Sequence, residues 1–203
     1  SENTAVGYQS LYDNTTGASN TGIGSYALTN VTTGANNTAL GKDAALNTTT
    51  ANGNVAVGRA TLYTNSTGAS NTALGETALY ANTTASNNTA VGYQAGYSNT
   101  TGTELTAIGK GALYTNSTGN YNTAVGYQSL RLNTTGSSNA AFGDEALRSN
   151  TTGGNNTASG NIALYANTTG TQNAAFGMQA LRFNTTASNN TAVGYQAAYS
   201  NTT

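Results

Sequence analysis

The apolar positions of this chain recur every seventeen residues, without insertion or deletion, through twelve repeats. Counted from the Asn before each strand-like run, the first repeat is Asn3–Ser19 and reads NTAVGYQSLYDNTTGAS. Position three is Ala in every repeat except at Gly22, position four is apolar in every repeat except at Ser159, and position five is always Gly. Position eight is always Ala, Ser or Thr, position nine is usually Leu, and position fourteen is always Thr, up to Thr203. Such a fixed period indicates one short unit stacked on itself into a solenoid.

The charged residues indicate which positions face water. The chain has six basic and seven acidic residues, and ten of these thirteen lie at positions six, seven and ten. None lies at positions one to five, eight, nine or twelve to sixteen. Burying an unpaired charge is costly, so we expect the charged positions to face solvent and positions four and nine to form the core.

The pattern predicts an all-β fold: a β-solenoid, or parallel β-roll, of twelve 17-residue coils with two short strands and two corners each. T-A-V at positions two to four is strand-like, and the following Gly suits a corner. N-T-T-G at positions twelve to fifteen is typical of a turn. The middle segment, such as GDEALRSN, is expected to be the second strand. One helical turn is the alternative, because Asp144 and Glu145 come early and Arg148 late, as a helix dipole favours.

The residue at position three also indicates how the coils pack. If position four points inward, position three points outward, yet it is always Ala or Gly. We expect a second surface close against it, either another chain or a neighbouring wall of the same coil. The first option predicts a multi-chain rod, such as a trimeric bundle.

The whole chain, residues 1–203, is a single repeat array whose repeats start at Asn3. Neither end shows a polar capping repeat, so we expect a slice of a longer fibre or a subunit that stacks end to end. The net charge of −1 gives no electrostatic reason to bind nucleic acid or an anionic membrane. No apolar stretch is long enough for membrane insertion. The predicted partner is the chain itself, in a lateral trimer or an end-to-end fibre.

Catalysis is not expected. The sequence contains no His and no Cys, which excludes thiol catalysis, His-dependent serine triads and His/Cys zinc sites. Its glycines form neither G-x-G-x-x-G nor a P-loop. We therefore predict no catalytic residue, no metal site and no cofactor other than covalent glycans.

The N-glycosylation acceptor N-x-[ST] occurs in every repeat at the Asn-Thr-Thr corner. In repeats two and three, where Val31 and Thr48 replace Asn, an Asn one residue earlier keeps the acceptor. A turn alone would account for Asn and Thr, but their fixed distance suggests modification; O-linked sugar on Thr16 and its equivalents is a variant. The predicted sites are Asn14, Asn30, Asn47, Asn65, Asn82, Asn99, Asn116, Asn133, Asn150, Asn167, Asn184 and Asn201. Four further acceptors, Asn36, Asn87, Asn155 and Asn189, arise where repeats join.

Tyrosine is frequent at positions six and ten. Stacked coils would arrange these rings in ladders about 4.8 Å apart. The rings are expected to stack on one another, and a stripe that binds carbohydrate or another partner is the alternative.

The runs NTAVGYQSL at Asn3–Leu11 and NTAVGYQAG at Asn88–Gly96 resemble the head repeat of trimeric autotransporter adhesins, with its pattern S-V-A-I-G-x-x-A/S. They are also similar to N-T-A-x-G repeats in shafts of phage tail fibres and bacterial surface proteins. The resemblance implies a left-handed parallel β-roll, three chains in a bundle, and an adhesive or spacer role at the cell surface, in the extracellular space or on a virion fibre. A surface carbohydrate of a host is a possible ligand of such a shaft.

A second interpretation is a ligand-binding solenoid. Regular Thr arrays on a flat β-face resemble insect-type ice-binding solenoids, and Thr15, Thr16, Thr83, Thr84 and their equivalents would form the array. Adjacent Thr residues in a strand point to opposite sides, which weighs against this reading of the corner.

Overall fold

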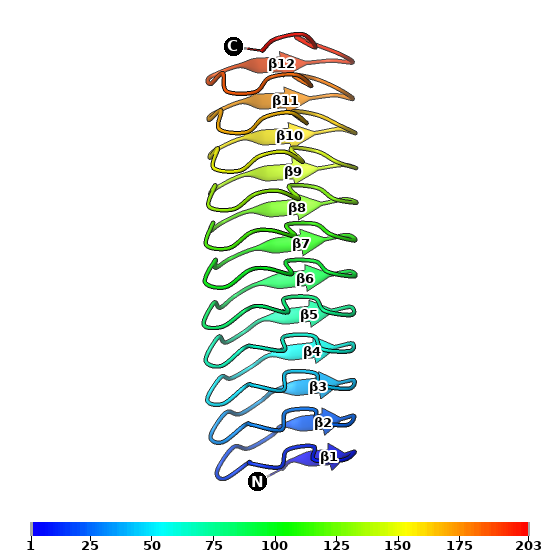
Figure 1. Ribbon diagram of the computed structural model, residues 1–203, viewed down its shortest axis with the longest axis vertical. Helices are drawn as coiled ribbons and strands as arrows, with labels where there is room; N and C mark the ends of the chain where they lie inside the picture. Colours follow the sequence, from blue (N-terminus) through cyan, green and yellow to red (C-terminus); the bar gives the residue numbers. More distant parts are fainter. Residues whose placement is uncertain (1, 203) are drawn as a thin grey trace.

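The computed structural model describes residues 2–202 and is a β-solenoid with about one repeat per coil. One parallel sheet of 12 strands runs along it, in sequence order from β1 to β12. The part of the chain that the model describes contains no helix. Figure 1 shows the strands one above another along a rod, with the two chain ends at its opposite tips. The strands are β1 Thr4–Val6, β2 Thr21–Ile23, β3 Thr38–Leu40, β4 Val55–Val57, β5 Thr72–Leu74, β6 Thr89–Val91, β7 Thr106–Ile108, β8 Thr123–Val125, β9 Ala140–Phe142, β10 Thr157–Ser159, β11 Ala174–Phe176 and β12 Thr191–Val193.

Each strand pairs with the same three positions of the next repeat, as Ala90 pairs with Ala107. Thr and the aliphatic residues at positions two and four suit a pleated strand. The inter-coil bonds continue beyond the strand: Thr38 N donates to Asn54 O at 2.8 Å, and Gly41 N donates to Ile23 O at 2.8 Å. The fold class and the first strand predicted from the sequence are therefore confirmed.

The glycine at position five makes the corner that follows each strand. At Gly126, φ is +140°, and a Cβ atom there would lie 2.3 Å from the carbonyl oxygen of Gly143 in the next coil. Only a residue without Cβ accepts both this backbone conformation and this approach of the neighbouring coil.

The middle segment is neither the expected second strand nor the alternative helical turn. It is a run of turns in which positions seven and nine have positive φ, as at Tyr26 (62°) and Leu28 (51°). This conformation costs an ordinary residue about 1–2 kcal/mol. It is held by bonds to the adjacent coils: Leu28 N donates to Ala44 O at 3.0 Å, and Tyr26 N donates to Tyr8 O at 2.8 Å. The segment thus keeps an inter-coil ladder without extended backbone.

The core differs from the expected one at position four. Leu at position nine is buried, as predicted, but the inward residue of the strand is the alanine of position three, and position four faces solvent. Ala73 and Leu79 are 0% and 1% exposed, whereas Leu74 is 47% exposed. Successive strand residues point to opposite faces, so an inward position three requires an outward position four. None of the charged side chains within residues 2–202 is buried.

Packing within a single chain explains the small residues at positions three and eight. Position eight of the turn wall lies against position three of the sheet wall: Ser129 Oγ donates to Ala141 O at 3.1 Å. At Gly22, a Cβ would lie 2.6 Å from Ser10 Oγ and 3.4 Å from Leu11 Cγ. The coil is narrow, and only small side chains fit between its two walls. The second surface is therefore the opposite wall of the same coil, and these residues give no support to a second chain.

Two columns of asparagine complete the interior, at positions one and twelve. Asn54 Nδ2 donates to Asn37 Oδ1 (3.1 Å) and to Gly68 O (2.9 Å), and its backbone N also donates to Asn37 Oδ1 (3.0 Å). At position twelve, Asn99 Nδ2 donates to Asn82 Oδ1 (3.0 Å) and to Gly102 O (2.9 Å). Where Asn occupies the same position in adjacent repeats, the two residues are hydrogen-bonded, so the ladders fix both the corner and the stacking.

Candidate functional surfaces

The outer side of the sheet, called here the sheet face, presents two columns of side chains. Position two is mostly Thr, and position four is aliphatic or aromatic except at Ser159. Along position four the more exposed side chains range from Ile23 at 38% to Val193 at 72%. Neither column contains a charged residue. The result is a long uncharged strip with hydroxyl groups on one side and apolar groups on the other.

A threonine column runs along position fourteen. It is exposed in all eleven repeats in which the model describes it, from Thr16 to Thr186; Thr203 lies outside the described residues. At position thirteen the side chain instead bonds to the next coil, as Thr83 Oγ1 does to Thr100 O at 3.1 Å. Ser substitutes there at Ser66 and Ser117, since the ladder needs only a hydroxyl. Position fourteen is always Thr although it faces solvent, so its hydroxyl and methyl groups are free for an external contact.

A tyrosine column lies along position ten. Tyr63, Tyr80, Tyr97 and Tyr114 stack with centroids 5.1–5.2 Å apart and planes within 8°. The guanidinium of Arg131 continues the stack, 5.2 Å from the centroid of Tyr114. The predicted ladder is confirmed at position ten in repeats four to seven, whereas the tyrosines at position six lie in repeats that are not adjacent. Burial and the neighbouring tyrosines raise the pKa of Tyr97 above its usual value.

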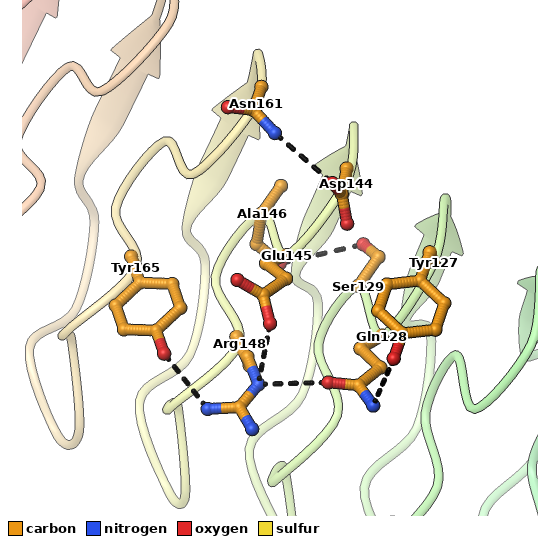
Figure 2. A network of polar contacts seen from close by, with 9 residues as sticks. All are labelled: Tyr127, Gln128, Ser129, Asp144, Glu145, Ala146, Arg148, Asn161 and Tyr165. Carbon is orange, nitrogen blue, oxygen red and sulfur yellow. Dashed lines mark hydrogen bonds and ion pairs between the residues drawn. The ribbon is translucent and has the colours of Figure 1, made fainter.

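Polar side chains of repeats eight to ten form a network that extends from the corner after the strand along the turn wall (Figure 2). Arg148 donates from Nε to Gln128 Oε1 (3.2 Å) and from Nη1 to Tyr165 OH (2.9 Å), and its Nε lies 3.3 Å from Glu145 Oε1. Gln128 Nε2 in turn donates to Tyr127 OH at 3.0 Å. Each of these bonds joins partners on the same or an adjacent coil, so the network stabilises stacking.

Charges at position six also pair along the rod. Arg59 forms an ion pair with Glu76 of the next repeat, and this hydrogen bond and the attraction of the carboxylate raise the pKa of Arg59. Both side chains are well exposed, so the pair adds little stability.

The structure places ten of the twelve predicted acceptors in the position-twelve column, and Asn30 and Asn47 at position eleven beside it. Asn65, Asn82, Asn99, Asn116, Asn133, Asn150, Asn167 and Asn184 are 0% exposed. Asn14, Asn30, Asn47 and Asn201 are half-buried. All twelve donate a hydrogen bond from Nδ2, the atom that would carry the sugar. A glycan on the eight fully buried amides is incompatible with the folded coil, and the ladder gives these asparagines a structural role.

The four acceptors where repeats join lie elsewhere. Asn36, Asn87, Asn155 and Asn189, at position seventeen, are exposed. Their φ values of 57–63° suit Asn, which accepts the left-handed conformation more readily than most residues. N-linked sugar at these positions is compatible with the fold, as is O-linked sugar on the threonine column.

Concave sites are absent from residues 2–202: this part of the surface has no pocket and no group of three or more acidic side chains that could hold a metal ion. The described residues also include no helix that could cross a membrane.

Comparisons with protein-family models, with curated proteins and with solved structures find no match for this chain. The resemblance to adhesin heads and tail-fibre shafts therefore stays a prediction from the repeat motif.

Sequence reasoning missed the exposed apolar column at position four. A signal was present, because that position varies from Val to Phe and accepts Ser159, while position three hardly varies. Protein interiors are close-packed, and a narrow core tolerates such changes in volume poorly. Variation in size was the better indicator of exposure.

Proposed function

We propose that the chain is a structural rod, the shaft of an extracellular, cell-surface or virion fibre, that carries no catalytic site. The observation that supports this most directly is the inter-coil ladder, which continues from repeat to repeat through strand, turn wall and asparagine columns. Every coil is held by its two neighbours in the same way, so length can change without a change of fold. Such an array sets a distance between the elements at its ends.

Location outside the cell is supported by the resemblance of the N-T-A-V-G-Y-Q run to surface-fibre repeats. Electron microscopy of the source material with an antibody against residues 1–203 tests both the location and the rod shape. We expect labelled filaments on intact cells or virions. Label confined to the cell interior would contradict the location, and globular labelled particles would contradict the rod.

Glycosylation of the shaft is a further part of the proposal, and the fold restricts it to accessible atoms. Peptide mapping by mass spectrometry after expression in a glycosylating host should find N-linked sugar at the four exposed acceptors and none at the eight fully buried ones. Sugar on Asn116 or its buried equivalents in folded protein would contradict the position-twelve ladder. A bare intact mass, 20.4 kDa, would remove glycosylation from the account and leave the shaft.

A second candidate function is supported by the regularity of the exposed threonines. The sheet face and the threonine column repeat at the coil spacing of about 4.8 Å, as a surface that binds ice or another periodic ligand requires. The double Thr rank expected from the sequence is not available, because position thirteen bonds to the next coil. Thermal hysteresis of the purified protein tests this candidate, and its absence would remove ice as the ligand.

A further inference from the structure

We propose that the sheet face is the interface of an antiparallel dimer, in which the sheets of two copies of this chain pack face to face. The inference deepens the proposed structural role by naming the surface and the orientation through which two rods associate. It assumes only the rod, and it does not depend on where the rod is located.

The sheet face carries a long apolar strip. Eleven of the twelve position-four residues are apolar, and they form one continuous column along a sheet about 53 Å long at 4.8 Å per strand. Soluble monomers rarely expose an apolar patch of more than a few hundred Å². The neighbouring Thr column offers hydroxyl groups but no charge that would oppose burial.

The charges at position six, immediately beyond the corner glycine, complement one another in an antiparallel dimer. Consider a two-fold axis parallel to the strands at the level of β6. It places each position opposite the same position of the second copy, so that repeat three faces repeat nine and repeat five faces repeat seven. Lys42 then faces Asp144 of the second copy, and Glu76 faces Lys110. The symmetry makes each of these pairs twice.

The remaining position-six residues agree with this register. Arg59 faces Tyr127 of the second copy, Tyr93 faces its own equivalent, and Tyr8 faces Met178. All five charges at position six thus meet an opposite charge or an aromatic ring, which can accept a cation on its face. A shift by one repeat in one direction places Arg59 opposite Lys110. A shift by one repeat in the other direction places Arg59 opposite Asp144 and Lys110 opposite Tyr93, but it leaves Lys42 opposite Asn161 and Glu76 opposite Tyr127. A shift by two in that direction places Lys110 opposite itself.

The apolar column fits the same register. Phe142 faces Leu40 and Phe176 faces Val6, while Val91 faces its own equivalent. The two phenylalanines are therefore never opposite each other, and each has a smaller aliphatic residue across the interface. Facing sheets pack about 10 Å apart, with side chains interdigitated.

A parallel arrangement makes less use of these residues. With the two-fold axis along the rod, position six faces the strand's position-two side, where most residues are Thr and none is charged. The five charges would then have no opposite charge across the interface. The antiparallel arrangement is the one that the surface favours.

The size of the strip predicts a weak dimer. A contact about 53 Å long and about 10 Å wide buries about 500 Å² per copy, or about 1,000 Å² in all, which is near the lower limit for a specific interface. We therefore expect a dissociation constant in the roughly micromolar range or weaker.

Distances between spin labels in the dimer test the orientation. The sequence has no Cys, so Thr16→Cys, Thr50→Cys and Thr101→Cys can each be labelled at one site, on the exposed threonine column away from the sheet face. In an antiparallel dimer, the two copies of the Thr101 label lie at the same height along the rod. The two Thr50 labels are about 29 Å apart along the rod axis, and the two Thr16 labels about 48 Å apart, at 4.8 Å per strand.

Equal distances at the three sites would show a parallel dimer or trimer and overturn the proposal. A protein that remains monomeric by sedimentation up to about 1 mM, well above the expected dissociation constant, would also overturn it. In that case electron microscopy of the monomer still decides the shaft proposal separately.

Charge-swap variants test the register. Lys42→Asp and Asp144→Lys each place like charges opposite each other twice, and each should weaken the dimer about tenfold or more. The double variant should restore wild-type affinity, and Asp13→Lys, an exposed change off the sheet face, should leave it unchanged. All three positions are solvent-facing, so circular dichroism should show the same fold in all four variants. Failure of the double variant to restore dimerisation would contradict this register.

Discussion

Replacement of the corner glycine tests the close approach of successive coils. In Gly126→Ala the new Cβ would lie 2.3 Å from Gly143 O and 2.6 Å from Gly143 C. Backbone at this position cannot rotate out of the way, because Gly143 N donates to Val125 O at 2.8 Å and Glu145 N donates to Tyr127 O at 2.9 Å. The two coils must therefore separate, and these two bonds are the first to be lost.

The expected magnitude follows from two contributions. An Ala held at φ of +140° is strained by about 1–3 kcal/mol. Loss of two inter-coil hydrogen bonds adds about 0.5–1.5 kcal/mol each. We expect a loss of about 4 kcal/mol in the stability of the repeat eight–nine junction, which is the sum of the central values of these ranges.

Gly194→Ala is the matched control within the 203-residue chain. Its φ is +128°, close to that of Gly126, but the nearest atom to a Cβ there is Ala197 Cβ at 3.9 Å. Gly194→Ala should lose only the stability that corresponds to backbone strain, about 2 kcal/mol. The difference of about 2 kcal/mol corresponds to a roughly 30-fold change in the opening equilibrium, at 1.4 kcal/mol per factor of ten.

Hydrogen exchange of individual amides is the appropriate assay, because stability in a repeat array is local and depends on adjacent units. In Gly126→Ala the amides of Gly143 and Glu145 should exchange faster, while amides several coils away should change little. Equal destabilisation by the two substitutions would show that backbone strain alone requires glycine, and would refute the role of the close approach.

Three other predictions follow from particular contacts. Val31→Asn should stabilise the chain by about 1 kcal/mol in chemical denaturation. The new amide would lie in the position-twelve ladder between Asn14 Oδ1 and Thr48 Oγ1, two buried atoms that lack partners. A loss of stability as large as that of Val31→Ala would contradict this. Leu113→Ala should cost about 3 kcal/mol, as a buried Leu does, whereas Leu74→Ala on the sheet face should cost less than about 1 kcal/mol in the monomer; similar losses would place position four in the core. Because the pKa of Tyr97 is raised in the folded state, its contribution to stability is present below the unfolded pKa of about 10 and is lost as pH rises through the folded value; circular dichroism between about pH 9 and 12 should show smaller loss in Tyr97→Phe, and an unchanged profile would contradict it.

The solenoid and its coil length could be predicted because the repeat states them directly. A glycine without exception every seventeen residues and a Leu at constant phase leave few other folds. The tyrosine ladder followed from the same reasoning, since identical positions in stacked coils must be neighbours.

The orientation of the strand could not be derived in the same way. Alternation shows that positions three and four face opposite sides, but hydrophobicity alone assigns the larger residue to the core. Here the core is too narrow for it: leucines from the turn wall, such as Leu79, fill the space, and alanines, such as Ala73, line the sheet wall. The width of a coil depends on both walls, and the sequence describes them separately.

Local conformational propensity could not predict the turn wall either. Leu28 and Leu62 have φ of 51°, a conformation that Leu adopts rarely in isolation. Inter-coil hydrogen bonds and burial stabilise it, and both depend on the repeat above and below. Likewise the acceptor motif at Asn82 could not be distinguished from a ladder residue before its amide was seen to bond with Asn65 and Ala85.

Solution scattering of a length series tests the central claim, that each repeat is one equivalent rung of a rigid rod. A variant that lacks residues 88–138, three whole repeats, is compared with the full chain under conditions that keep both monomeric. The account predicts that the maximum dimension falls by about 14 Å, at 4.8 Å per coil, and that the cross-section is unchanged. A particle that becomes smaller in all dimensions, or that unfolds when whole repeats are removed, would contradict it.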